Sequence, residues 1–142
     1  ICCTTVAVPS NDRCIAAITL EEGVEEFGNN ADANYDYNSQ GVCGSRSDRR
    51  ALWYQIFGTG KEITVSVCTN NEAVTDFGIF FQCNDQLCLG HPGQQDEPSN
   101  CEDGDAVTYT FLGEEGENYF VHVRADWFNG VASEFMIKYT EP

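Results

Sequence analysis

The residues of this chain whose types and spacing could carry chemistry are above all its cysteines. The sequence holds eight of them in 142 residues: Cys2, Cys3, Cys14, Cys43, Cys68, Cys83, Cys88 and Cys101. No CxxC pair occurs, and the two histidines, His91 and His122, lie far apart in sequence, so the spacing does not match a zinc site. An even set of cysteines scattered among strand-like segments predicts a disulfide framework, which persists in oxidising compartments. We therefore expect an extracellular or cell-surface protein.

The spacing also favours particular cysteine pairs, although it does not determine the connectivity. We predict one local bridge and two long-range ones: Cys83–Cys88, Cys14–Cys43 and Cys68–Cys101. The adjacent Cys2 and Cys3 can bond to each other only under strain, because bridged Cα atoms lie about 4.4–6.8 Å apart. Either they form such a vicinal bridge, or at least one of them reaches another part of this chain or another chain.

Oxygen-bearing side chains alternate along one loop, as they do where a loop wraps calcium. The candidate metal ligands are Asn30, Asp32, Asn34, Asp36 and Asn38. The pattern departs from an EF-hand, since Tyr37 stands where the sharp turn requires Gly and Cys43 stands where a bidentate Glu is needed. The alternative is a polar surface loop held by Asx turns. Calcium is the only cofactor that the sequence suggests.

Motifs that would indicate catalysis are missing from the sequence. It contains no GxSxG, HExxH, P-loop or GxGxxG pattern. His122 falls in a predicted strand beside Arg124 on the polar face, where we expect a solvated or structural role. We therefore predict that the chain is not an enzyme.

Apolar residues repeat with a period of two along most of the chain, which is typical of β-strands. Half-buried strands are predicted at 61–68, 106–112, 117–125 and 133–139, and strands covered on both faces at 14–20, 51–57 and 76–82. Stretches rich in Gly and Asn separate them. This arrangement predicts an all-β protein, an antiparallel jelly-roll-like β-sandwich stapled by disulfides. We expect one domain over 14–142, preceded by a segment, 1–13, that could act as an arm between subunits.

The charge of the chain excludes some partners. There are 23 Asp and Glu against 7 Lys and Arg, a formal net charge of −16. Such a surface repels nucleic acid and anionic membranes, and no apolar run approaches the ~20 residues that span a bilayer. We expect neither nucleic-acid binding nor direct membrane insertion. Since Ile1 comes first and Met136 is the only Met, we also expect a processed segment without its signal peptide.

Two groups of residues are candidates for contacts with a ligand or a second copy. Arg46, Arg49 and Arg50 form a basic cluster that could dock on the acidic surface of another copy, or could merely offset local repulsion. Trp127 and Phe128 fall at a predicted loop tip, where they could stack on a sugar or insert into a neighbouring subunit. The alternative is that these aromatic side chains cap an open end of the sandwich.

Several segments taken together resemble a known family. A cysteine-bearing first strand is followed by an acidic Asn/Asp-rich loop, Cys43-Gly44, LWYQIFGTG and ITVSVC, and later by TDFGIFFQC, GENYFVHV and SEFMIKY. This succession resembles the bacterial pre-peptidase C-terminal (PPC) type of domain between Cys14 and Tyr139. The resemblance implies a non-catalytic β-sandwich of secreted or surface proteins, often implicated in attachment to matrix or polysaccharide, with calcium bound in some relatives. The Cys2-Cys3 start and the many cysteines depart from that pattern.

These features predict a non-catalytic extracellular structural or adhesive module that self-associates, for example as a subunit or repeat of a surface filament or matrix. The alternative is a carbohydrate- or matrix-binding module appended to a secreted protein, with an extracellular glycan or matrix polymer as its partner. A small secreted hydrolase or inhibitor has no sequence feature in its favour.

Overall fold

A computed structural model of the chain describes residues 8–33, 43, 50–69, 76–83, 87–92, 106–124 and 134–142. Within these residues the elements follow one another as η1 (Cys14–Ala16), β1 (Ile18–Thr19), β2 (Glu26–Asn29), β3 (Ala51–Phe57), β4 (Glu62–Thr69), β5 (Asp76–Phe80), β6 (Cys88–Gly90), β7 (Val107–Leu112), β8 (Asn118–Arg124) and β9 (Glu134–Thr140). No helix in this part of the chain is long and apolar enough to cross a membrane.

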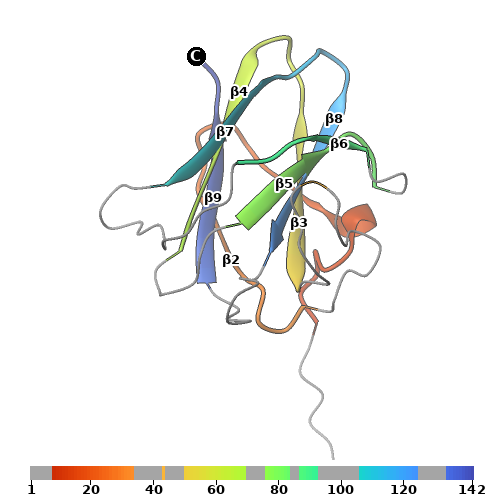
Figure 1. Cartoon of the computed structure of the whole chain (residues 1–142), viewed down its shortest axis with the longest axis vertical. Coiled ribbons are helices and arrows are strands. Elements are labelled where there is room, and N and C mark those ends of the chain that lie inside the picture. Colours follow the sequence, from red (N-terminus) through yellow and green to blue (C-terminus); the bar gives the residue numbers. More distant parts are fainter. Residues whose placement is uncertain are drawn as a thin grey trace, which may run out of the picture.

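The strands form two sheets that pack face to face, as Figure 1 shows. One sheet has five strands in the order β1-β3-β8-β5-β6, and the other has four in the order β2-β9-β4-β7. Neighbouring strands run antiparallel except for the short β1, which pairs with β3 in parallel. The predicted β-sandwich is therefore confirmed, with one parallel pair added at its edge.

Alternation along the strands places one face of each sheet in the core. In β4, Ile63, Val65 and Val67 are fully buried, whereas the intervening Thr64 and Ser66 lie on the outer side. β-branched side chains suit an extended backbone with one covered face, which explains why this segment forms a strand. β9 repeats the pattern, so the inward faces predicted from the period of two are confirmed.

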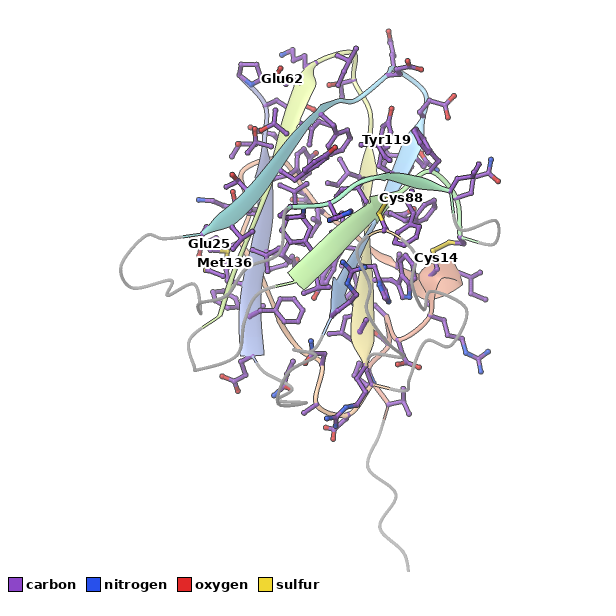
Figure 2. The ribbon with its side chains drawn as sticks, viewed as in Figure 1. Cys14, Glu25, Glu62, Cys88, Tyr119 and Met136 are labelled. Atoms are coloured by element: carbon purple, nitrogen blue, oxygen red, sulfur yellow. A yellow bond between two sulfur atoms is a disulfide. The ribbon has the colours of Figure 1, made fainter. Side chains whose placement is uncertain are left out.

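Aromatic side chains fill the space between the sheets. The ring of Tyr119 in β8 lies 4.9 Å from that of Phe111 in β7, and Tyr54 meets Phe135 edge-on at 6.1 Å. Figure 2 shows Tyr119 between the two sheets. The Tyr119 hydroxyl accepts a hydrogen bond of 2.9 Å from the backbone N–H of Glu114, so its polar atom is satisfied in the core.

The segment 14–20 is not the central strand that the sequence predicts. It forms the 3-10 turn η1 and the short edge strand β1, and Ile15 is 80% exposed. The chain here runs along the edge of the five-stranded sheet, where only one side of an apolar run can be covered. The structure also adds β2 and β6, two short edge strands that the sequence does not predict.

Every cysteine that the structure describes is disulfide-bonded, which confirms the framework but not the predicted pairs. Cys14 bonds to Cys83 and Cys43 to Cys88, with Cα–Cα distances of 5.5 and 5.1 Å. The predicted Cys83–Cys88 and Cys14–Cys43 bridges are therefore wrong. β5 and β6 form a hairpin, and each of its two cysteines joins an earlier segment that crosses the sheet.

The remaining cysteines are described only in part. Cys68 is disulfide-bonded and 1% exposed, and its partner lies outside the described residues. Cys2, Cys3 and Cys101 also lie outside them, so the Cys68–Cys101 bridge and the state of the Cys2-Cys3 pair stay predictions.

Candidate functional site

The outer face of the five-stranded sheet, on the side away from the sandwich core, is covered at one end by packed side chains. Trp53 in β3 and His122 in β8 lie directly opposite each other, with ring centroids 4.3 Å apart. Phe80 meets the His122 ring edge-on at 6.0 Å. His122 is fully buried here, so the solvated role expected of a polar strand face is wrong and its role is structural.

A disulfide covers this end of the face because one residue of the sheet is a glycine. A Cβ added at Gly78 would lie 3.0 Å from the sulfur of Cys43, so a larger residue would push the Cys43–Cys88 bridge off the sheet. Arg124 donates a hydrogen bond of 2.9 Å from its Nη2 to the Cys43 carbonyl. The buried arginine therefore holds the segment that covers the sheet.

The described part of the predicted N-terminal arm also lies on this sheet. Asn11 forms two hydrogen bonds of 2.9 Å with the backbone of Trp53, one through its side chain and one through its carbonyl. Asn11 and Asp12 are buried as a result. Residues 8–13 thus pack on their own domain, and residues 1–7 lie outside the described part of the chain.

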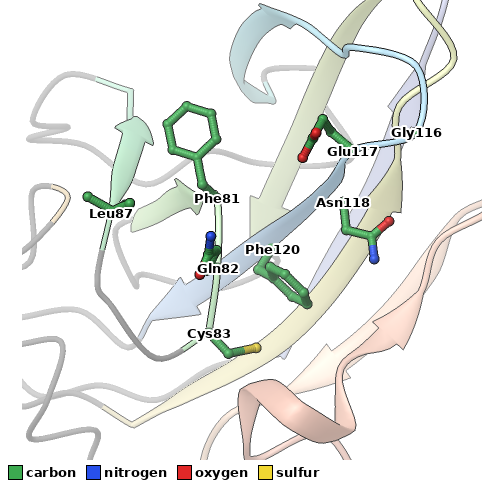
Figure 3. A pocket seen from close by; sticks show the side chains of 8 residues that line it. All are labelled: Phe81, Gln82, Cys83, Leu87, Gly116, Glu117, Asn118 and Phe120. Atoms are coloured by element: carbon green, nitrogen blue, oxygen red, sulfur yellow. The ribbon is translucent and has the colours of Figure 1, made fainter.

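The opposite end of this sheet, where β5 ends and β8 begins, is open and holds a hollow of about 650 Å³, which we call the aromatic hollow. The residues that shape it are Phe81, Gln82, Leu87, Glu117, Asn118 and Phe120. Figure 3 shows Phe81 on one side of it, Glu117 and Asn118 on the other, and Phe120 between them. Two exposed apolar side chains thus stand beside three polar ones in one concave surface.

Local hydrogen bonding explains why Phe81 is exposed. Its backbone N–H donates to the Leu87 carbonyl at 3.0 Å, which continues the β5–β6 hairpin one step beyond the strands. Phe80 faces the covered outer side of the sheet, so the neighbouring Phe81 turns to the core side, where its ring lies 6.2 Å from that of Tyr119 at the end of the sandwich and is 44% exposed. Phe57, at the end of β3, is 49% exposed and pairs with Asn118 on the same outer face.

A tight turn positions the polar side of the hollow. The N–H of Glu117 donates to the Glu114 carbonyl at 3.1 Å, and Gly116 within this turn has a φ of +87°, which favours glycine. The N–H of Gly58 donates to the Glu117 carbonyl at 2.8 Å. The carboxylate of Glu117 and the amide of Asn118 therefore extend from a backbone segment that these hydrogen bonds hold on both sides.

A disulfide forms part of the wall of the hollow, beside aromatic, aliphatic and amide side chains and one carboxylate. Cys83 lies in the wall of the hollow and is bonded to η1. Among the lining residues Glu117 is the only charged one, and none is a histidine, serine or free thiol. Aromatic faces next to amide groups can contact a neutral, hydroxyl-rich ligand.

The structure describes two of the five predicted calcium ligands. Asn30 is buried and Asp32 is exposed, while Asn34, Asp36 and Asn38 lie outside the described residues. The N–H of Ala31 donates to the Asn29 side chain at 2.9 Å, as in an Asx turn. In the described part of the chain, no group of three or more His, Cys, Asp or Glu could hold a metal ion. Calcium binding stays a prediction.

Of the residues predicted to contact a ligand or a second copy, the structure describes only Arg50. Arg50 is half-buried and donates a hydrogen bond of 2.8 Å from its Nη1 to the Ala31 carbonyl, which ties the start of β3 to the loop after β2. Arg46, Arg49, Trp127 and Phe128 lie outside the described residues. The basic patch and the aromatic loop tip remain predictions.

The sequence alone did not predict the aromatic hollow. Phe80 ends β5 and Phe81 follows it, and alternation places two such neighbours on opposite sides of the sheet, so both cannot be covered in the same way where the sheet ends. That pair is the signal that could have pointed to Phe81. Asn118 and Glu117 come from a distant segment, and only the β5–β8 pairing brings them near.

Comparisons with known proteins find similarity in fold. No protein-family model matches the sequence. No curated protein matches it either. The pre-peptidase C-terminal domain of a collagenase from Bacillus anthracis is similar with a TM-score of 0.55 and 10% identity, covering 87% of this chain and 94% of that one. CorA, a surface-associated copper-binding protein of Methylomicrobium album BG8, is similar with a TM-score of 0.53 and 10% identity. The match covers 89% of this chain and 98% of that one. The chain therefore has a PPC-like fold.

Proposed function

We propose that this chain is a non-catalytic extracellular attachment module that binds a neutral polysaccharide through the aromatic hollow. The observation that carries the proposal is the pair of exposed phenylalanines, Phe81 and Phe57, beside the amide of Asn118 on a surface fixed by a disulfide. What supports a contact is their grouping with Leu87, Phe120 and amide groups in one concave surface, since apolar residues exposed singly are common.

The extracellular location is supported by two observations. Every described cysteine is disulfide-bonded, and such bridges persist outside the reducing cytosol. Two solved structures of similar fold belong to a collagenase and to a surface-associated protein. Both fit a module that works outside the cell.

The chemistry of the hollow selects the class of ligand. Phenylalanine rings pack against the apolar C–H faces of sugars, while amide groups such as those of Gln82 and Asn118 both donate to and accept from hydroxyls. Glu117 adds an acceptor for hydroxyl donors. A formal net charge of −16 repels anionic polymers, so a neutral glycan fits better than an acidic one.

The test is a binding assay of the oxidised chain against insoluble neutral polysaccharides, such as cellulose, chitin and a β-1,3-glucan. We expect retention on at least one polymer, and the Phe81→Ala variant should lose about tenfold or more in affinity, since aromatic anchors dominate such contacts. Val24→Ala, which removes an exposed apolar side chain outside the hollow, is the control. Equal retention of the Phe81→Ala variant, or no retention of the wild type on any polymer, would contradict the proposal.

A second function, as a structural or adhesive subunit of a surface filament or matrix, is favoured by a different observation. Phe27 on the edge strand β2 is 70% exposed and lies on the other sheet from the aromatic hollow. An exposed phenylalanine at a sheet edge supports contact with another protein surface.

A further inference from the structure

A second hollow adjoins the aromatic hollow at the same end of the sandwich. It measures about 410 Å³ and is lined from β6, β7, β8 and the turn before β8, among others by Leu89, Phe111, Leu112, Glu114 and Tyr119. We call it the edge hollow, because β6 and β7 are the last strands in the described order of their two sheets. The edge hollow therefore carries the concave surface from the five-stranded sheet to the four-stranded one.

Two residues line both hollows. They are Phe81, which follows β5, and Glu117 in the turn before β8. Figure 3 shows these two side chains on opposite sides of the surface, with Phe120 further along it in the aromatic hollow. The hollows are therefore neighbours, and one ligand can contact both of them by passing over Phe81 and Glu117.

The ring of Phe81 is held where it can contact a ligand in either hollow. It lies 6.2 Å from the ring of Tyr119 at a tilt of 50°, so it leans on the core and is not stacked flat against it. The residue stays 44% exposed. Its backbone N–H donates to the Leu87 carbonyl at 3.0 Å, which fixes the segment that carries the ring. The ring is therefore a common wall between two binding surfaces.

A single turn supplies carboxylates to both hollows. Glu114 lines the edge hollow and Glu117 lines both, and the N–H of Glu117 donates to the Glu114 carbonyl at 3.1 Å. The N–H of Glu114 donates to the Tyr119 hydroxyl at 2.9 Å, so the core anchors this turn. Ionised carboxylates only accept hydrogen bonds. A neutral ligand beside this turn must therefore supply donors, as a sugar does through its hydroxyl groups.

The edge hollow repeats the chemistry of the aromatic hollow. Leu89, Phe111 and Leu112 give it an apolar wall, and Leu112 is 61% exposed. Among the described residues that line it, Glu114 and Glu117 are the only charged ones. Apolar surface beside hydrogen-bond acceptors suits the same class of ligand in both places, since sugars present apolar C–H faces and hydroxyl edges.

The sizes of the hollows indicate that more than one sugar unit is bound. The aromatic hollow of about 650 Å³ and the edge hollow of about 410 Å³ each fall within the ~300–1,000 Å³ typical of a whole small-ligand pocket. Both are open to solvent. A chain can therefore enter across one hollow and leave across the other, which a closed pocket would prevent.

We propose that the two hollows form one groove that holds consecutive sugar units of a single neutral polysaccharide chain, with Phe81 at its middle. This arrangement rests on the polysaccharide binding proposed above, and it names the part of the polymer that is recognised. One unit lies in the aromatic hollow, the chain passes over Phe81 and Glu117, and further units lie in the edge hollow beside Leu112 and Glu114. The module thus binds an extended stretch of the polymer rather than a single sugar.

The experiment is calorimetric titration of the oxidised chain with cello-oligosaccharides, chito-oligosaccharides and β-1,3-gluco-oligosaccharides, each from the disaccharide to the hexasaccharide. We expect the affinity for at least one series to rise about tenfold or more with length, because a unit already bound in one hollow holds the next units close to the other. A short oligosaccharide should bind in the larger aromatic hollow alone.

A variant of the edge hollow separates the two parts of the groove. Leu112→Ala with Glu114→Ala alters two exposed residues, and it should remove most of the gain with length while changing the affinity for the shortest bound oligosaccharide by no more than about twofold. The matched control is Val24→Ala with Glu115→Ala, which removes one exposed apolar side chain and one exposed carboxylate outside both hollows. This control should bind every length as the wild type does.

The outcomes distinguish this groove from the binding function itself. An affinity that does not rise with length would overturn the groove, and so would equal weakening of hexasaccharide binding by the edge variant and its control. In either case, retention of the wild type on a polymer and its loss in Phe81→Ala would still support the proposed function. A wild type that binds no polymer and no oligosaccharide would contradict both.

Discussion

At the scale of single residues, tyrosines in or beside the core couple the protein's stability to high pH. Burial raises the pKa of Tyr54 to about 12, and the Glu26 carboxylate adds to that increase. Burial also raises the pKa of Tyr139, with Glu141, Glu22 and Glu21 contributing. Each hydroxyl favours its neutral form more strongly in the folded state than in the unfolded chain.

Stability should therefore fall as the pH rises from about 10 to about 12. In that range an unfolded Tyr54 has lost its proton while the folded one retains it, so raising the pH favours unfolding. The loss attributable to Tyr54 is about 3 kcal/mol across the window, since each pKa unit corresponds to about 1.4 kcal/mol. Urea unfolding between pH 9 and 12 measures the slope. A Tyr54→Phe variant with an unchanged slope would contradict this assignment.

Calcium binding, also a question of single residues, can be tested through stability. If the loop from Asn30 to Asn38 binds the ion, millimolar calcium should raise the melting temperature, because a ligand of the folded state stabilises it by mass action. The Asp32→Ala, Asp36→Ala variant should lose that response, and Glu114→Ala with Glu115→Ala should keep it as a control of equal charge. If the wild type has the same melting temperature in calcium and in chelator, the loop does not bind calcium.

At the scale of elements, two disulfides hold the β5–β6 hairpin against earlier segments of the chain. Cys14–Cys83 joins residues 69 apart in sequence and Cys43–Cys88 joins residues 45 apart. The first lies in the wall of the aromatic hollow, and the second covers His122 and Trp53 on the same sheet. Cys14 also packs against the cluster of Cys43, Trp53 and Phe80, so both bridges border one cluster, and only Cys14–Cys83 also lines the hollow.

Removing each bridge should separate these roles. Replacing Cys14 and Cys83 with alanine should cost about 4 kcal/mol, as expected for a loop of this length, and should weaken polysaccharide binding. Replacing Cys43 and Cys88 should cost a similar amount and weaken binding less, since that bridge does not itself line the hollow and reaches it only through the neighbouring Leu87. Denaturant unfolding and the pull-down assay give the two readouts. Equal loss of binding in both variants would argue against the hollow as the site.

At the scale of the whole molecule, the two sheets present different surfaces to the outside. The five-stranded sheet presents aromatic rings and amides in a hollow at its end, and the four-stranded sheet presents Phe27 beside Met136 on its outer side. Because these two surfaces share no residue, one copy could hold a polymer while contacting a second copy. This arrangement is compatible with both the binding and the structural role.

The sequence by itself determined which segments are strands and which side chains face the core. Ile63, Val65 and Val67 in β4, and Phe135 and Ile137 in β9, follow a period of two that depends only on local backbone geometry. The β-sandwich and the disulfide framework follow from that pattern and from the cysteine count. The sequence did not predict the edge strands β2 and β6, because strands of four and three residues are too short to show a period of two.

Only the tertiary structure decided what lies next to what. Cys83 pairs with Cys14 rather than with the nearby Cys88, because β5 and β6 form a hairpin whose two cysteines join different earlier segments. His122 is buried because Cys43 and the segment around Asn11 cross an outer face that alternation alone would expose. The aromatic hollow and the Phe27–Met136 pair likewise join residues far apart in sequence. Such contacts depend on strand order, which is set by the packing of the whole chain rather than by any local pattern.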